Sequence, residues 1–228
     1  MPRCFSVLPE LVRCSEYVIP NGVDVEKYSP GTSTVKAELN ARRLFVYQGR
    51  LSPEKNLESL LRAWRQAEMG PDSKLLMVGN GPLASSLQSL CDFESSVVWL
   101  GFVADEQQRI KILQGADVFV LPSLVEGLSL SLLEAMACGT ACLATDAGAD
   151  GEVLETGAGV VLNTQRVATQ LQTLLPMFRD HPELTILLGQ KARQRVLERY
   201  TLSRNVTQVE ELYTQLLSPS HVYLKSRV

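Results

Sequence analysis

The sequence predicts an α/β protein with a doubly wound parallel sheet, helices on both faces and a helical tail at the carboxyl end. Two observations support this fold class. From about residue 44, short apolar runs rich in β-branched residues alternate with longer segments of helical period, which is the pattern of βαβ units. After Leu162 the short runs cease and only helical patterns follow. With 228 residues, the chain is long enough to bury a core of its own.

The individual elements can be placed in chain order. Six strands are predicted at residues 44–49, 74–81, 97–102, 117–123, 141–146 and 159–162. Amphipathic patterns between them predict helices at residues 57–68, 83–92, 105–116 and 131–139, the last stopped by Gly139. Three further helices, at residues 164–178, 182–200 and 202–217, form the tail, which we expect to pack outside the sheet. The turn residues of segment 18–30 predict a structured connector.

Composition narrows the class of protein. A content of 45% hydrophobic and 21% charged residues is ordinary for a folded chain, and a formal net charge of −3 provides no broad basic surface for nucleic acid. The five cysteines are scattered without a C-x-x-C pair, which argues against a disulfide framework or a zinc site and favours a reducing, cytoplasmic location. No apolar stretch reaches the roughly 18 residues that a membrane-spanning helix needs. Residues 1–14 lack the basic segment followed by an apolar segment that is typical of a signal peptide. Peripheral association with a membrane stays open.

Four loops that follow predicted strands carry the residues of interest. Ligands of open parallel sheets bind outside the carboxyl ends of the strands, where loops lead into helix N-termini. The loops at residues 49–56, 79–82, 101–106 and 122–129 lie at such ends. We therefore expect them to converge on one rim.

The loop at residues 79–82 combines two glycines. Gly79 and Gly81 flank Asn80 and give the backbone a freedom that lets a ligand approach closely. The loop matches neither G-x-G-x-x-G nor a Walker sequence, so the pattern supports neither NAD nor P-loop binding. The alternative is a tight turn whose glycines only allow positive φ.

The loop at residues 49–56 carries two cations. Arg50 and Lys55 suit a bound phosphate, because the guanidinium can engage two oxygens while the ammonium adds a mobile charge. Asn56 is a good N-cap for the helix that begins near Leu57. The alternative is a solvated surface pair in which Glu54 is the partner of Lys55.

The loop at residues 122–129 leads into a helix that begins within residues 128–131. Gly127 allows close approach of a ligand, and the unpaired amides and positive dipole end of the helix form an anion site. A diphosphate held between these amides and the two cations would gain charge as it departs, so the same donors would stabilise a leaving group.

Two glutamates, Glu126 and Glu134, lie eight positions apart around this helix start. The helical period brings both to the same general side, and carboxylates accept hydrogen bonds from sugar and ribose hydroxyls. Two alternatives stay open. Ser131 and Glu134 have the spacing of a capping box, and Glu126 could simply favour the helix N-terminus electrostatically.

Taken together, these segments resemble the carboxyl-terminal, donor-binding domain of retaining glycosyltransferases of the GT-B fold, in family four. The resemblance runs from about residue 18 to residue 217. Its strongest parts are "GRLSPEKN", "VGNGP", "WLGFV" and "ADVFVLPSLVEGLSLSLLEAMACG", in that order. The fold implied is a Rossmann-like half of a GT-B enzyme.

The resemblance implies a role for each matching position. Arg50 and Lys55 would bind the diphosphate of a nucleotide sugar, and Glu126, first of the family's E-x7-E pair, would contact the donor sugar; these three form the expected catalytic set. Glu134 would take the ribose hydroxyls. The remaining substrate contacts implied are the amides of Gly127, Leu128 and Ser129 for the phosphates and sugar, the backbone around Phe102 and Val103 for the base, and Asn80 and Gly81 nearby.

The resemblance also implies a missing part. Residues 1–17 would be a linker from an absent amino-terminal acceptor domain, residues 18–199 the donor domain, and residues 200–228 a helix that packs back toward the absent domain. That domain would supply a catalytic histidine, whereas His181 and His221 are expected at the surface. No D-x-D motif occurs, so we expect no metal and no cofactor beyond the nucleoside diphosphate sugar.

The function implied is transfer of a sugar from a nucleoside diphosphate sugar to an acceptor hydroxyl on a glycan, lipid or small molecule, with retained anomeric configuration. The isolated chain would bind the donor and transfer little or nothing. Two alternatives remain: a non-catalytic sugar-nucleotide-binding subunit of a split enzyme, or another GT-B enzyme such as a nucleotide-sugar epimerase or a phosphorylase.

Overall fold

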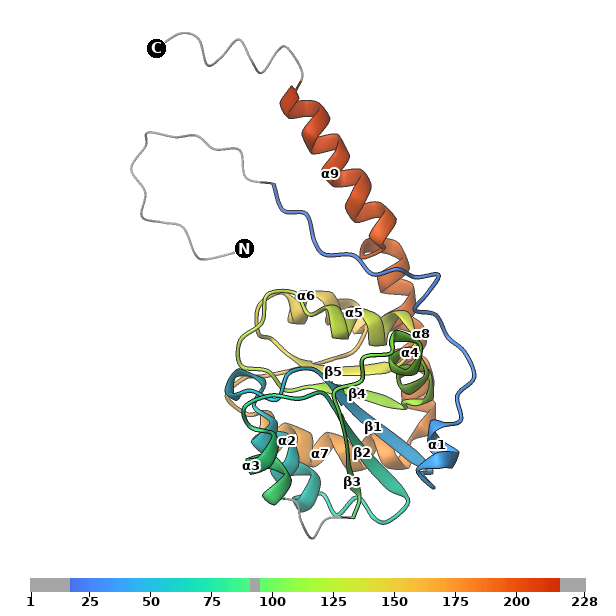
Figure 1. Ribbon diagram of the computed structural model, residues 1–228, viewed down its shortest axis with the longest axis vertical. Coiled ribbons are helices and arrows are strands. Elements are labelled where there is room, and N and C mark those ends of the chain that lie inside the picture. Colours follow the sequence, from blue (N-terminus) through green and yellow to red (C-terminus); the bar gives the residue numbers. More distant parts are fainter. Residues whose placement is uncertain (1–16, 91–94, 218–228) are drawn as a thin grey trace, which may run out of the picture.

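The computed structural model describes residues 17–90 and 95–217, which form a single parallel sheet between two layers of helices (Figure 1). The strand order is β3-β2-β1-β4-β5-β6, and each neighbouring pair is parallel. The strands are β1 (Arg43–Gln48), β2 (Ser73–Val78), β3 (Val97–Gly101), β4 (Val118–Leu121), β5 (Ala141–Thr145) and β6 (Val160–Leu162). The predicted α/β fold is confirmed.

Helices cover both faces of the sheet (Figure 1). One face carries α2 (Leu57–Gln66), α3 (Ala84–Ser89) and α7 (Val167–Asp180), and the other carries α4 (Glu106–Gly115), α5 (Leu130–Ala137), α6 (Asp150–Leu154) and α8 (Pro182–Arg199). The predicted tail is therefore part of the two layers, since α7 packs along α2 and α8 packs on β5 and α5. Only α9 (Leu202–Leu217) extends away from them, and none of its described residues is buried.

Four short elements were not predicted. They are α1 (Val35–Glu38), the 3-10 turns η1 (Pro53–Lys55) and η2 (Glu155–Gly157), and α6. Each has at most five residues, which is too short for a helical period to show in the sequence. The helix expected at residues 83–92 ends at Ser89 as α3, and residues 91–94 lie outside the described part.

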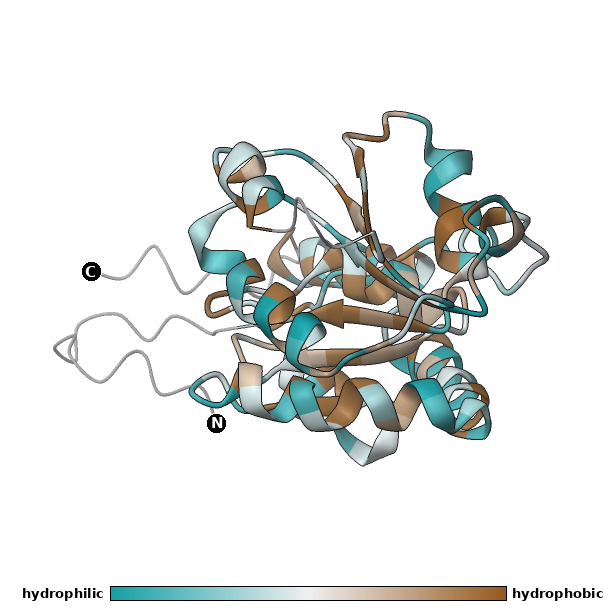
Figure 2. Cartoon of the chain, turned by 90° about the horizontal axis from the view of Figure 1, so that it is seen from below, coloured by the Kyte–Doolittle hydropathy of each residue, from teal (hydrophilic) through white to brown (hydrophobic). Residues whose placement is uncertain are grey.

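The core lies on both sides of the central strands, where β1 is buried along its whole length. Figure 2 shows this arrangement, with hydrophobic strands inside and hydrophilic helix faces outside. Phe45 of β1 meets Trp64 of α2 edge to face at 5.2 Å between ring centroids. The indole Nε1 of Trp64 donates to Ser96 Oγ at 2.8 Å, so the largest core side chain also has its polar atom satisfied.

The connector before the sheet is held by the end of α8. Val23 N donates to Tyr200 O and Leu202 N donates to Val23 O, each at 2.9 Å. Arg193 of α8 adds bonds to the carbonyls of Tyr28 and Val25. The predicted structured connector is confirmed, and the chain passes from α8 to α9 at this junction.

Parts of the domain prediction fall outside the described residues. Residues 1–16, expected as a linker, and His221 are among them. His181 is exposed, as expected. Within residues 17–90 and 95–217, no helix has both the length and the apolar character required to cross a membrane.

Candidate functional site

The rim at the carboxyl ends of the strands has its crevice between β1 and β4. The chain adds β2 and β3 on one side of β1, then returns to place β4 on the other, so the loops after β1 and β4 leave the sheet in opposite directions. These loops, residues 49–56 and 122–129, nevertheless meet. Leu124 N donates to Glu54 O at 2.8 Å, and Asn56 Nδ2 donates to Pro122 O at 3.2 Å. The predicted convergence of these two loops is confirmed.

Asn56 has a different role from the predicted one. It precedes α2, but its φ of 52° is left-handed and its side chain caps no helix amide. Its amide group instead bridges to the β4 loop, and its Oδ1 accepts from Ser59 Oγ at 2.7 Å. Asparagine suits this junction, because it tolerates the left-handed region while bonding locally.

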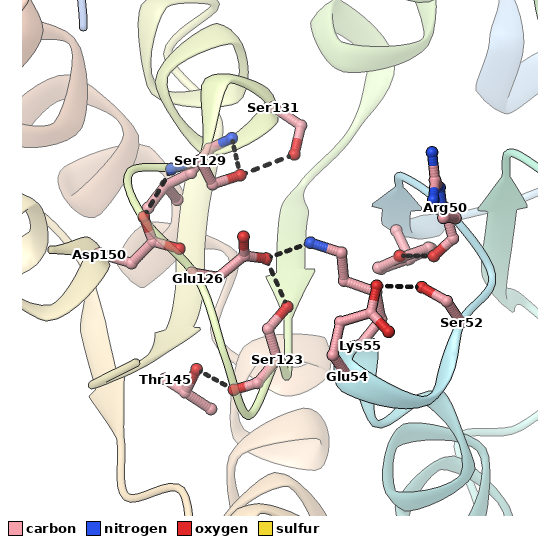
Figure 3. Close-up of polar contacts among 12 residues, drawn as sticks. Arg50, Ser52, Glu54, Lys55, Ser123, Glu126, Ser129, Ser131, Thr145 and Asp150 are labelled. Carbon is pink, nitrogen blue, oxygen red and sulfur yellow. Dashed lines mark hydrogen bonds and ion pairs between the residues drawn. The ribbon is translucent and has the colours of Figure 1, made fainter. Parts of the chain in front are cut away.

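Lys55 and Glu126 form an ion pair across the crevice (Figure 3). Lys55 Nζ lies 2.5 Å from Glu126 Oε1, and the side chains are only 18% and 10% exposed. Ser123 Oγ donates to the same carboxylate oxygen at 2.7 Å. The alternative in which Glu54 partners Lys55 is wrong, because Glu54 accepts from Ser52 Oγ and Lys55 turns toward Glu126.

A cavity of about 530 Å³ lies at the ends of β1, β2 and β3, and the loop that carries Lys55 contributes Gly49 and Arg50 to its lining. Four of the predicted residues line it, namely Arg50, Asn80, Phe102 and Val103. The Phe102 side chain is 74% exposed and offers an aromatic face to a ligand, whereas Val103 is buried beneath. The loops after the first three strands therefore share one hollow.

The two glycines beside Asn80 are required by backbone packing. A Cβ on Gly79, whose φ is 134°, would lie 1.8 Å from Gly49 O, and a Cβ on Gly81 would lie 2.3 Å from Leu51 O. The loops after β1 and β2 thus pack backbone against backbone at both glycines. Neither close approach of a ligand nor a turn with positive φ is enough to explain why both positions are glycine. Gly81 lies outside the cavity lining, and its amide donates to Asn80 Oδ1 at 2.7 Å.

The head of α5 is capped by Ser129, whose Oγ accepts from Leu132 N at 3.4 Å. The capping-box alternative is wrong, because the cap is Ser129 rather than Ser131. The Ser129 amide donates to Asp150 Oδ1 at 2.9 Å (Figure 3). The amides of Gly127 and Leu128 donate to no atom of the described residues, and a Cβ on Gly127 would meet nothing within 4 Å. This stretch of backbone is open to a ligand.

Glu134 faces the end of β1. Gln48 Nε2 donates to Glu134 Oε2 at 3.1 Å, and Gln48 also lines the cavity. Burial raises the pKa of the Glu134 carboxyl above its ordinary value, while the Tyr28 hydroxyl and the charge of Arg109 oppose the rise. Glu126 and Glu134 therefore contact β1 or the loop after it, although Glu126 lies before α5 and is not positioned by the helical period.

Three residues of this region were not predicted from the sequence. Gln48 could have been predicted, because it is a polar residue at the end of an otherwise apolar buried run. Arg109 of α4 lines the cavity and donates to Val103 O and Ala104 O at 3.0 and 2.9 Å, but nothing distinguishes it within a polar helix. Asp150 is fully buried at the start of an unpredicted helix.

Fold and site together define an α/β domain in which two cations and a helix start with unengaged backbone amides lie at a topological switch point. The chain belongs to the glycosyl transferases group 1 family, whose model matches residues 42–177, more than half of the 228 residues. A relative is the GDP-mannose-dependent monoacylated alpha-(1-6)-phosphatidylinositol monomannoside mannosyltransferase of Corynebacterium glutamicum. It is 32% identical over an alignment of 194 residues, which covers 78% of this chain and 50% of the relative.

Solved structures confirm the fold. The Anabaena protein HepE in complex with UDP has a TM-score of 0.77 and 22% identity, with 88% of this chain and 57% of HepE covered. The carboxyl-terminal domain of a group 1 glycosyl transferase, LpcC of Francisella tularensis, has a TM-score of 0.68 and 22% identity, with 79% of this chain and 100% of that domain covered. The chain spans about half the length of the curated relatives it matches.

Proposed function

We propose that the chain is the donor-binding part of a retaining glycosyltransferase that moves a sugar from a nucleoside diphosphate sugar to an acceptor hydroxyl. The observation that carries this proposal is the Lys55–Glu126 pair, which joins the two loops of the switch point beside a cavity lined by Arg50. An open helix start, two cations and a hollow with an exposed Phe102 are the features that a diphosphate linked to a base requires.

The nucleotide would occupy the cavity. Phe102 and Val103 would border the base, and Asn80 lies on the same wall. Glu134 would accept the ribose hydroxyls, because its carboxylate is held beside the cavity by Gln48. The UDP complex of HepE supports a nucleotide in this class of fold.

The diphosphate would lie between the cavity and the head of α5. Arg50 can engage its oxygens from the cavity side, and Lys55 has two further N–H groups besides the one that meets Glu126. As the bond from the sugar to the diphosphate breaks, negative charge grows on the departing oxygen. The same cations and the amides of Gly127 and Leu128 then stabilise it, which lowers the barrier.

Glu126 would contact the transferred sugar. Its second carboxylate oxygen is not engaged by Lys55 or Ser123, both of which meet Oε1. The acceptor site is assigned to the part of the relatives that this chain does not span, so the chain alone should bind donor without efficient transfer. The alternative of a non-catalytic sugar-nucleotide-binding subunit of a split enzyme would use the same donor site.

The proposal is tested by thermal-shift and calorimetric titration of the full chain with UDP, GDP, ADP, UDP-glucose and GDP-mannose. A ligand specific for the folded state at a hundredfold excess over Kd stabilises it by about 2.7 kcal/mol, so at least one of these should raise the Tm by several degrees. Glu134→Ala should weaken binding of the nucleotide about fivefold, because ribose hydroxyls lose a charged acceptor.

The matched control is Glu211→Ala, which removes an exposed carboxylate from α9 and should leave binding unchanged. Absence of binding by all five nucleotides, or equal affinity in Glu134→Ala and the wild type, contradicts the proposal. Release of nucleoside diphosphate at the rate of a full enzyme would contradict the expectation that this chain lacks the acceptor part.

A further inference from the structure

Asp150, at the start of α6, is a buried carboxyl group beside the proposed diphosphate site. It has no exposed surface. Its Oδ1 accepts from Ser129 N at 2.9 Å, and its Oδ2 has no hydrogen-bond partner among the described residues. A buried acidic oxygen without a partner is costly. The presence of such an oxygen in a folded protein indicates a role beyond stability.

The segment before Asp150 supports the loop that leads into α5. Ala149 N donates to Gly127 O at 2.8 Å. A Cβ on Gly148 would lie 2.1 Å from Glu126 O and 2.5 Å from Gly127 O, so the two backbones touch. The Asp150 side chain adds a third contact, to Ser129. The loop is thereby held at Glu126, Gly127 and Ser129 from one side, and Lys55 approaches Glu126 from the other (Figure 3).

The charge of Asp150 is coupled to the same site. Burial raises the pKa of its carboxyl group to about 6, the bond from the Ser129 amide opposes the rise, and the negative charge of Glu126 adds to it while Lys55 lowers it. An added diphosphate would bring more negative charge to this position. The protonated form of Asp150 is then favoured further, because like charges disfavour ionisation.

Other charged groups near α6 are directed elsewhere. Asp146 accepts from Thr164 N at 3.0 Å on the β6 side, and Glu152 is exposed. Arg195 of α8 donates to the backbone oxygen of Glu152. The groups that act on Asp150 from the neighbouring elements are therefore Glu126 and Lys55.

We propose that Asp150 is a positioning residue of the donor site: it holds the Ser129 amide so that the free Gly127 and Leu128 amides face the diphosphate, and it takes up a proton from solvent when the diphosphate binds. This inference rests on the proposed function for its ligand. By linkage, a ligand that raises a pKa binds more tightly at pH values below that pKa. Affinity for a nucleotide sugar should accordingly increase as the pH falls from above the raised pKa toward about 6, and should level off below about 6, the pKa of the free protein.

The first test needs no ligand. In ¹H–¹⁵N spectra of the full chain, the Ser129 amide should show a titration with a midpoint near pH 6, because its acceptor changes charge. Asp150→Asn keeps an acceptor oxygen and should abolish this titration. Asp146→Asn, the same change at the neighbouring carboxylate, should leave it intact. A Ser129 amide that does not titrate, or that titrates in Asp150→Asn, overturns the inference.

The second test measures Kd for UDP-glucose and GDP-mannose at pH 5.5 and 7.5; their diphosphates are diesters and do not titrate in this range. The wild type and Asp146→Asn should bind severalfold more tightly at pH 5.5, whereas Asp150→Asn should show a much smaller difference, which reports the remaining groups such as Glu134. Asp150→Ala, which removes the acceptor, should bind about tenfold more weakly at both pH values.

The outcomes separate the two proposals. If the wild type binds and Asp150→Asn keeps the full pH difference, only the role of Asp150 is overturned. If the wild type binds neither sugar nucleotide and no nucleoside diphosphate, the proposed function fails and the positioning role falls with it. Thermal melts of each variant identify any that fail to fold, and Asp150→Asn, which retains the acceptor, decides the question if Asp150→Ala is among them.

Discussion

The cavity and the head of α5 form one rim but are built differently. On the cavity side, Arg50 is exposed and its side chain takes no part in the hydrogen bonds among described residues, and Phe102 stands 74% exposed. At the head of α5, Glu126 already accepts from Lys55 and Ser123, and the Ser129 amide is held by Asp150.

This difference separates two kinds of site residue. The exposed side chains of Arg50 and Phe102 make no hydrogen bond among the described residues, so their removal should affect binding alone. Side chains at the head of α5 define the loop geometry through internal bonds, so their removal should affect both stability and binding. The following predictions, from the largest effect to the smallest, test this distinction.

The largest effect on stability should come from Gly79, with Gly127 as the comparison. Gly79→Ala combines a φ of 134° with a Cβ 1.8 Å from Gly49 O, and should lower the free energy of unfolding by about 4 kcal/mol. Gly127→Ala introduces a Cβ into open space and should change it by no more than about 0.5 kcal/mol, while weakening nucleotide-sugar binding. Urea unfolding measures the free energy of unfolding of both variants. If Gly79→Ala and Gly127→Ala were destabilised equally, Gly79 would not be required by backbone packing as described.

The two cations should differ in the same way. Arg50→Ala should weaken nucleoside diphosphate binding about thirtyfold, or about 2 kcal/mol, without changing stability. Lys55→Ala should also weaken binding, but it leaves the mostly buried Glu126 without its cation and should cost about 2 kcal/mol of stability.

The double variant Lys55→Ala, Glu126→Gln serves as the control for this pair. It removes the uncompensated charge and should recover most of the lost stability without recovering binding, as measured by urea unfolding and calorimetry. If Arg50→Ala were destabilised as much as Lys55→Ala, the two sides of the rim would not differ as described.

The smallest effect should come from Phe102→Ala. Loss of base stacking should weaken nucleotide binding about fivefold, or about 1 kcal/mol, with stability unchanged because the ring is largely exposed. Tyr213→Ala removes an aromatic ring that is 64% exposed on α9 and is the matched control. Calorimetry that finds the same Kd for Phe102→Ala and the wild type would place the base away from the loop after β3.

The prediction of the fold succeeded where elements are long or flanked by clear turns. Every predicted strand occurs, because buried parallel strands appear as continuous apolar runs. The missed elements, α1, α6, η1 and η2, are single turns stabilised by their surroundings. In the predicted tail, α7 and α8 pack outside the sheet as expected, α7 along α2 and α8 on β5 and α5, whereas α9 extends away from both layers.

The prediction of the site was right about which loops meet and incomplete about the contacts between them. Lys55 and Glu126 were both predicted to act on the ligand, but their pairing depends on β1 and β4 being neighbours. Gly79 and Gly81 were interpreted either as room for a ligand or as a turn that needs positive φ, and the contact between the loops after β1 and β2 is a further requirement that the sequence did not indicate. The ligand contacts assigned to individual residues remain predictions.

The order of amino acids alone specified the alternation of strands and helices, and with it the edge of the sheet where the polar loops emerge, because hydrophobic period and turn chemistry are local properties. The tertiary structure decided which distant groups became partners, such as Ser129 with Asp150 and Gln48 with Glu134. The physical reason is that these bonds join side chains brought together by strand order and burial, and neither is encoded within any one segment.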